Sequence, residues 1–170
     1  MSVDYSRITP YFHNYVKLVD SPQSLQEAFK QESYMFLELL QSISATKSEY
    51  RYAEDKWSIK DVLQHIIDAE RIFAYRALRI ARQDKTPLAS FDENSYAIAA
   101  AADKRSWEGL VNEFVCVRQS SDMLFRHFSE EDLEREGQAS NAICYVRGIG
   151  YIILGHTRHH ANILETRYLL

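Results

Sequence analysis

The stretch SIKDVLQHIIDAERIFAYRALRIAR, residues 58–82, shows most clearly how the chain folds. Ser58 is a suitable N-cap for a helix, and Asp61 occupies the third position after it. Trp57 precedes the cap and can pack back onto the helix as a hydrophobic staple. Apolar residues recur three and four positions apart, the spacing that gives a helix one apolar face; they are Ile59, Val62, Leu63, Ile66, Phe73 and Ala77. We therefore predict a long helix from about residue 59 to 82.

The same periodicity predicts three further long helices, one before this stretch and two after it. The first is SPQSLQEAFKQESYMFLELLQSIS, residues 21–44, where Ser24 and Glu27 have the spacing of a capping box and Ser21-Pro22 offers an alternative start. The others are predicted from about residue 105 to 128 and from about 142 to 168. Four long helices indicate an all-α four-helix bundle.

Shorter segments connect these helices. The chain opens with a short segment around residues 11–19, and residues 129–132 start another turn or two. Between the second and third long helices, residues 83–105 contain Pro87 and an alanine-rich run that predicts one short helix at 94–102. A connector of this length can cross the bundle, so that the second and third helices run in parallel.

The composition is that of an ordinary globular domain, and we expect one domain over residues 1–170. A net charge of −4 argues against a nucleic-acid-binding protein. The sequence contains no run of 18 apolar residues, so we expect no membrane-spanning helix. The N-terminus lacks the apolar segment of a signal peptide. The cysteines, Cys116 and Cys144, form no CxxC motif, and we expect two reduced, buried thiols in the cytoplasm.

Three of the six histidines lie in GHTRHH, residues 155–160. His156 and His160 are four residues apart and therefore share one face of the last helix, in the middle of its isoleucine-rich stripe. Neutral imidazole is the form that binds a metal, and an i,i+4 pair is a known helical geometry for doing so. Two ligands make a weak site, and His65 on the second helix is the natural third. The alternative is three packing histidines that hydrogen-bond to backbone or carboxylate groups.

The remaining histidines have simpler interpretations. His159 falls toward the edge of the apolar stripe, and His13 and His127 are expected to be ordinary surface or capping residues. The last helix lacks the glutamate of the HExxH motif, so zinc-protease chemistry of that type is not indicated. Glycines at 148, 150 and 155 lie in the last helix, where close approach of another element is the simplest account and a bend is the alternative.

Three motifs in order resemble the DinB/YfiT-like superfamily. RYAEDKWSIKDVLQHIIDAERIFAYRAL and GHTRHHANILETRY resemble its two histidine signatures, and PLASFDENSYA resembles its connector. The resemblance covers about residues 20 to 168. It implies a four-helix bundle with a crossover and a divalent metal held by His65, His156 and His160, with His159 in a supporting role. Relatives are often homodimers, and some resemble low-molecular-weight thiol S-transferases.

The ligand set does not identify the metal or the reaction. Three imidazoles suit zinc, nickel, iron or cobalt. Such an ion can activate water for hydrolysis or a bound thiol for transfer, so we expect a hydrolase or a thiol S-transferase acting on a small molecule. The alternative is a non-catalytic stress-related or binding module with a structural or vestigial metal site, or a helical interaction protein without metal.

Four charged residues are weaker site candidates. Asp61 and Asp68 flank His65 on the helix and can orient its imidazole, although a helix-surface or helix-end role is favoured for both. Asp92 in the connector either faces the site or caps a turn or helix. Arg167 either binds an anion or forms an ion pair at the end of the bundle.

Overall fold

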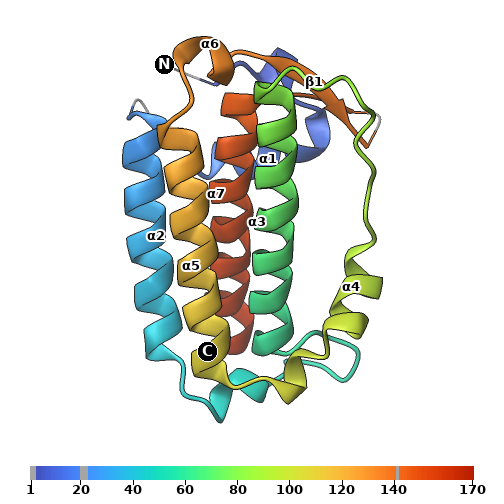
Figure 1. Cartoon of the computed structure of the whole chain (residues 1–170). Coiled ribbons are helices and arrows are strands. Elements are labelled where there is room, and N and C mark those ends of the chain that lie inside the picture. The colour runs from blue at the N-terminus through green and yellow to red at the C-terminus, as the bar shows by residue number, and fades with distance from the viewer. Residues whose placement is uncertain (1–2, 20–22, 141) are drawn as a thin grey trace.

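The computed structural model describes residues 3–19, 23–140 and 142–170, and its core is a bundle of four long helices (Figure 1). This confirms the predicted all-α four-helix bundle. The long helices are α2 (Leu25–Ser42), α3 (Ile59–Ala81), α5 (Trp107–Arg126) and α7 (Val146–Ile163), the last continuing into a π-helical turn at Leu164–Tyr168.

Side-chain caps determine where three of these helices begin, and two of them, Ser24 and Ser58, were predicted. The Ser24 hydroxyl accepts a hydrogen bond from the Glu27 amide, and the Glu27 carboxylate accepts one from the Ser24 amide, so α2 starts with a capping box. The alternative start at Ser21-Pro22 lies outside the described residues. Ser58 and Asp61 form the same reciprocal arrangement at the start of α3. Ser106 caps α5.

The connector between α3 and α5 crosses the full length of the bundle. In Figure 1 it runs from one end of α3 along the outside to the other end, carrying α4 (Glu93–Ala100) on the way. Helix α5 therefore starts at the same end as α3, and the two helices run in parallel, as the length of the connector predicted. A 3₁₀ turn at Ala102–Lys104 leads into α5.

A β-hairpin before α7 corrects the predicted start of the last helix. After the short helix α6 (Glu130–Leu133), β1 (Glu136–Ala139) pairs antiparallel with β2 (Ala142–Tyr145), and α7 begins only at Val146. Residues 142–145, which we expected to be helical, are therefore strand. Cys144 and Tyr145 bury their side chains in this strand, and the ladder gives its backbone a set of hydrogen bonds that competes with the helix.

The N-terminal segment lies across α7 and requires small residues there. It contains 3₁₀ turns at Tyr5–Arg7 and Pro10–Phe12 and then α1 (His13–Lys17). A Cβ atom on Gly155 would lie 2.1 Å from the Tyr15 carbonyl oxygen, which cannot be relieved by a side-chain rotation. Gly155 therefore allows the backbone of α1 to approach α7, which supports the prediction that close approach explains the glycines of this helix.

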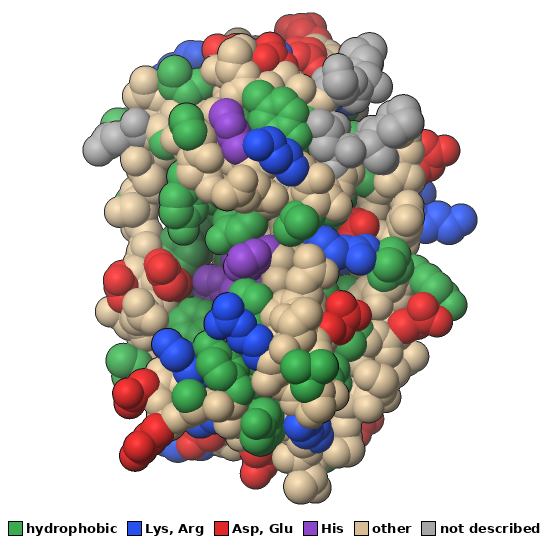
Figure 2. All heavy atoms as spheres, turned by 180° about the vertical axis from the view of Figure 1, so that it is seen from behind, with side chains coloured by type: hydrophobic (Ala, Val, Ile, Leu, Met, Phe, Trp, Pro, Cys, Tyr) green, Lys and Arg blue, Asp and Glu red, His purple; other side chains and the backbone are tan. Residues whose placement is uncertain are grey.

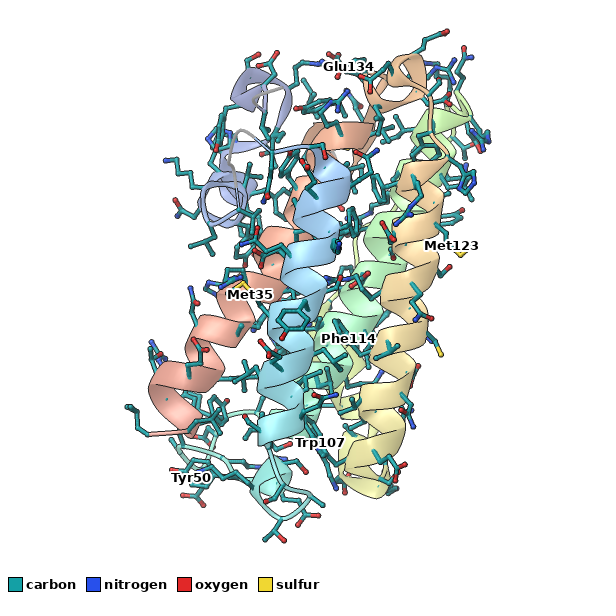
Figure 3. The ribbon with its side chains drawn as sticks, turned by 90° about the vertical axis from the view of Figure 1, so that its left-hand side faces the viewer. Met35, Tyr50, Trp107, Phe114, Met123 and Glu134 are labelled. Carbon is teal, nitrogen blue, oxygen red and sulfur yellow. The ribbon has the colours of Figure 1, made fainter. Side chains whose placement is uncertain are left out.

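Two apolar clusters fill the bundle, one toward each end. Along α3 the change from one cluster to the other falls between Ile67 and Ala69, and along α7 it falls between Leu154 and Ala161. Figure 3 views the α2–α5 side, where Trp107 and Phe114 belong to one cluster and Met123 points away from the bundle. Buried polar side chains occupy the level between the clusters.

Three consecutive residues of α7 bind three different helices at this level. His156 faces His65 of α3, and Thr157 accepts a hydrogen bond from Arg118 of α5. Arg158 pairs with Glu32 of α2. Successive residues of a helix point about 100° apart, so one turn of a central helix can serve three neighbours.

Among the described residues, no helix is both long and apolar enough to span a membrane.

Candidate metal centre

His65, His156 and His160 come together as the sequence predicted, with their Nε2 atoms facing one another. The Nε2 atoms of His65 and His156 are 2.9 Å apart, and those of His160 and His156 are 3.1 Å apart. One ligand atom from each of the three rings lies within 4.8 Å of the others. The pair comes from one face of α7, and the third ring comes from α3, where the N-cap at Ser58 sets the register.

Hydrogen bonding among the three rings cannot satisfy all of them. A neutral imidazole nitrogen carries either one proton or one lone pair. The Nε2 atom of His156 therefore cannot form a good hydrogen bond with both His65 and His160 at once. A shared cation would take one lone pair from each ring, and nitrogen ligands at about 2.0–2.1 Å from a tetrahedral ion lie about 3.3 Å from one another, close to the spacings found here. The donor set fits a divalent transition metal.

The environment keeps the three rings neutral, which is the metal-binding form. Burial lowers the pKa of His65 to about 4, although the negative charge of Glu93 acts in the opposite direction. Burial, and then the neighbouring His65 and His159, lower the pKa of His160 to about 3. Burial also holds the pKa of His156 well below its usual value, and the nearby rings add to the effect.

The histidines form one wall of a pocket of about 490 Å³ between α3, α7, the N-terminal segment and the connector. Figure 2 shows histidine side chains in a hollow bordered by hydrophobic side chains. Much of the lining is aromatic or aliphatic: Phe12, Tyr15, Trp57, Phe73, Phe91, Ile149 and Ile152. A largely apolar pocket with a few polar groups at one end is typical of a small-molecule site.

The aromatic residues beside the histidines hold their rings in place. Trp57 packs against His65 with ring centroids 4.9 Å apart, so the predicted staple residue also contacts the site. Tyr15 of α1 packs edge-on against His156 with centroids 5.6 Å apart. Because Gly155 admits α1 at this position, the N-terminal segment closes one side of the centre.

The other histidines lie outside the converging trio. His159 is half-buried, and its ring packs against Tyr15 with centroids 5.1 Å apart, in keeping with the supporting role that the resemblance implies. His13 binds the carbonyl oxygens of Tyr5 and Ile8 through Nε2. His127 binds the Met123 carbonyl at the end of α5. These contacts agree with the ordinary surface or capping roles that we expected for the two residues.

The acidic candidates bind elsewhere. Asp61 serves the N-cap of α3 and pairs with Arg51 at 2.9 Å. Asp68 accepts a hydrogen bond from Gln64. Asp92 caps α4 through the Ser95 amide. Asp61 and Asp68 therefore have the helix-end and helix-surface roles that were favoured for them. Asp92 has the capping role, which was one of the two considered for it.

The last of the charged candidates, Arg167, contacts an aromatic side chain. It donates to the Tyr52 hydroxyl at 3.3 Å, and its guanidinium lies over the same ring. Its expected ion pair at the end of the bundle is absent among the described residues.

The sequence analysis missed two charged residues that line the pocket. Glu93, at the start of α4, is the one acidic residue among the described residues of the lining, and Arg76 of α3 is the one arginine. It also missed the buried ion pair of Glu70 with Arg118, whose Nε and Oε1 atoms are 2.9 Å apart. The signal for Arg76 and Glu70 was their position near the apolar stripe of α3, where a charge requires a partner.

The cysteines differ from the prediction in one respect. Both are free thiols, and Cys144 is buried, but Cys116 is exposed. Cys116 lies between Phe114 and Val117 of α5, both of which turn toward the core, and it falls on the outward side of the helix. Burial raises the pKa of Cys144 to about 11, so this pocket residue stays a thiol and is a poor nucleophile.

Solved structures with the same fold include two with informative descriptions. YfiT from Bacillus subtilis, described as a probable metal-dependent hydrolase with an unusual four-helix bundle topology, is 13% identical with a TM-score of 0.69, and the match covers 95% of this chain and 87% of YfiT. A mycothiol-dependent maleylpyruvate isomerase is 12% identical with a TM-score of 0.68, and the match covers 89% of this chain and 59% of the isomerase. At these identities the likeness concerns the fold.

Sequence comparison identifies the family more directly than these structures do. No curated protein sequence showed significant similarity to the chain. The model of the DinB superfamily, however, matches residues 28–164, a range that runs from α2 to the end of α7 and includes all three converging histidines. The chain therefore belongs to the DinB superfamily.

Proposed function

We propose that this protein is a metal-dependent enzyme that acts on a small organic molecule, with a divalent transition metal held by His65, His156 and His160. The observation that carries the proposal is the convergence of three neutral imidazole nitrogens on the wall of an open, mostly apolar pocket. Zinc, nickel and iron all suit this ligand set. A cytoplasmic location and a homodimer stay predictions from the sequence.

The number of ligands favours catalysis over a purely structural metal. Structural zinc sites are closed by four protein ligands, whereas catalytic sites have three and leave a position for water or substrate. In the described part of the chain, the group that can hold an ion consists of the three histidines, without a fourth cysteine, histidine or carboxylate. The pocket gives a small molecule access to the ion.

A bound ion would supply Lewis acidity and would lower the pKa of a water molecule or thiol that it binds. The protein supplies the surroundings for that chemistry. Trp57, Tyr15 and Phe73 pack around the rings and exclude bulk water. Glu93 lines the same pocket, and its charge acts on His65, so its exposed carboxylate is placed to accept a proton from a molecule bound there.

Two reactions are equally compatible with the three histidine ligands. One is hydrolysis, which the description of YfiT supports for a protein of the same fold. The other is transfer involving a low-molecular-weight thiol, which the description of the mycothiol-dependent isomerase supports. The alternative from another functional class is a non-catalytic module in which the metal only stabilises the fold.

Metal analysis of untagged protein, combined with activity assays, tests the proposal. We expect about one equivalent of metal per chain after reconstitution, with His156→Ala below a tenth of an equivalent and His127→Ala unchanged, because His127 binds a carbonyl away from the centre. Ester hydrolysis and thiol conjugation to monochlorobimane are then assayed with and without metal. Whichever of the two activities is found should require the metal, both in wild type and in His127→Ala. Full metal binding without either activity would favour the non-catalytic alternative.

The role of Glu93 has a separate test. Glu93→Gln should lower kcat by about 100-fold or more if the carboxylate accepts the proton, while metal content stays unchanged. Asp103→Asn, which removes a charge from the same connector outside the pocket lining, is the matched control. Equal kcat values for the two variants would remove Glu93 from the mechanism.

A further inference from the structure

Arg76 lines the same pocket as the histidines, and its environment is unusual for a buried charge. It lies on α3 with 6% of its surface exposed, next to the connector and the β-hairpin. Eleven residues separate it from His65 on the same helix, which is about 16 Å along the helix axis. The pocket therefore has histidines near one end and a guanidinium near the other.

The hydrogen bonds of Arg76 to the described residues use one of its three nitrogen atoms. Its Nη2 atom donates to the Ala89 carbonyl at 2.7 Å and to the Ser140 hydroxyl at 3.0 Å. Within the described residues, no hydrogen bond or ion pair occupies its Nε or Nη1 atoms. A guanidinium has five N–H donors, so three of them have no partner among the described residues in this pocket-lining side chain.

The other buried arginines show what this chain normally does with such a charge. Arg118 is 3% exposed and binds the Glu70 carboxylate. Arg147 is 8% exposed and binds Glu130 and Glu134. Arg76 is buried to the same degree and has no carboxylate partner among the described residues. Because an uncompensated buried charge is costly, its retention in a pocket points to a negative charge supplied by a ligand.

The middle of the pocket sets the character of the rest of that ligand. The Phe73 ring is 6.2 Å from the His156 ring, and the Arg76 guanidinium carbon is 5.8 Å from the Phe73 ring. Phe73 therefore spans the interval between the two polar ends, together with the apolar side chains of Phe12, Ile149 and Ile152. A molecule that reaches both ends must have an apolar body.

We infer that the pocket binds a small carboxylate-bearing molecule with an apolar body, whose carboxylate pairs with Arg76 and whose other end lies at the histidines. The guanidinium fork matches a carboxylate bidentately. A single cation without a lysine in the described lining balances one negative charge, which favours a carboxylate over a doubly charged phosphate. The position of the reacting end rests on the proposed function, whereas the Arg76 site does not.

Binding of matched acid and amide probes tests the inference. Phenylalkanoic acids of increasing chain length, including phenylbutyrate, and their neutral amides are titrated by calorimetry into protein freed of metal with a chelator, so that the carboxylate cannot bind a metal instead. We expect the best acid to bind about tenfold or more tightly than its amide, as for a charge-assisted hydrogen bond. Binding of none of the acids, or equal binding of acid and amide, would overturn the inference.

Variants assign the preference to Arg76. Arg76→Gln should abolish it, while Arg79→Gln should keep it, because Arg79 carries the same charge on the same helix but pairs with Asp84 outside the pocket. A preference that survives in Arg76→Gln would reject the assignment. If Arg76→Gln does not fold, Ser140→Ala decides: it removes one of the bonds to Arg76 but keeps the charge, so the preference should persist, and its loss would count against the guanidinium.

The outcome separates this inference from the proposed function. The preference for the acid should persist in His156→Ala protein, which lacks one of the proposed metal ligands. A protein that prefers the acid but binds no metal would retain the Arg76 site and lose the proposed metal enzyme. A protein that binds metal without preferring the acid would retain the enzyme and lose the carboxylate site.

Discussion

Two polar clusters lie beside each other in the middle of the bundle, and they are built on opposite principles. In the first, Arg118 donates to Glu70 through two nitrogen atoms and to Thr157 through one of them, and the whole group is buried. In the second, His65, His156 and His160 direct nitrogen atoms at a common point beside a pocket. His156 and Thr157 are consecutive, so one turn of α7 serves both clusters.

The difference shows how a polar group in a core can be assigned to structure or to function. Both carboxylate oxygens of Glu70, the Nε and Nη2 atoms of Arg118 and the Thr157 hydroxyl are hydrogen-bonded within the protein, so the cluster ties α3, α5 and α7 together. Among the described residues, the nitrogen atoms of the three histidines have only one another as hydrogen-bond partners, which is an incomplete set for buried polar groups. The first cluster should therefore govern stability, and the second should govern binding.

The largest predicted effect is on the first cluster. Glu70→Ala leaves the Arg118 guanidinium buried without its counter-charge, and we expect it to lower the free energy of unfolding by about 3–5 kcal/mol. Urea denaturation of metal-free protein measures this change. Asp122→Ala, which removes the partner of the exposed Arg126, should change stability by less than about 1 kcal/mol. Equal effects of the two substitutions would contradict the structural role of the Glu70 pair.

An intermediate effect is expected from acid on the second cluster. The pKa of His65 is about 4 in the folded protein and near 6.5 when unfolded, so the unfolded state binds more protons between these values. The stability of metal-free protein should be complete above pH 6.5 and should fall as the pH drops toward 4, by about 2–3 kcal/mol from His65 alone. Denaturation at several pH values gives the free energy of unfolding as a function of pH. This free energy should fall less with decreasing pH for His65→Phe than for wild type, and an equal fall in both proteins would refute the assignment.

The smallest effect on stability is expected from removal of a central histidine. His156→Leu replaces an imidazole that cannot satisfy both neighbours with a side chain suited to the surrounding isoleucines. In chelator, its free energy of unfolding should stay within about 1 kcal/mol of wild type, although the stabilisation that added metal gives to wild type should disappear. A loss as large as that of Glu70→Ala would mean that the histidines are a structural network like the first cluster.

The sequence predicted the parts of the fold that depend on local signals. The caps at Ser24 and Ser58 and the helical periodicity placed α2 and α3 closely, and the long connector predicted that α3 and α5 are parallel. The hairpin was missed because residues 142–145 form a short apolar run next to a helix, which periodicity alone cannot assign to strand or helix. Ser140 adopts the left-handed conformation in the hairpin, with φ of 55°. A glycine at this position would have indicated a turn, but the sequence has a serine there.

The convergence of the three histidines was predictable from the sequence, but their surroundings were not. His156 and His160 share a helix face through their spacing, and the family resemblance implied His65 as the third member. Glu93, Arg76 and the Glu70–Arg118 pair depend on contacts between elements far apart in the sequence, such as the bond from Arg76 to Ser140. Spacing within one helix contains no information about such contacts.

X-ray absorption at the zinc, nickel and iron edges of untagged, metal-reconstituted protein tests the central claim most directly. We predict one ion per chain with imidazole nitrogen atoms of three residues in its coordination shell, at about 2.0–2.1 Å if the ion is zinc, and a smaller imidazole count or no ion in His156→Ala. Less than a tenth of an equivalent after reconstitution, or a shell without imidazole, would contradict a three-histidine metal site.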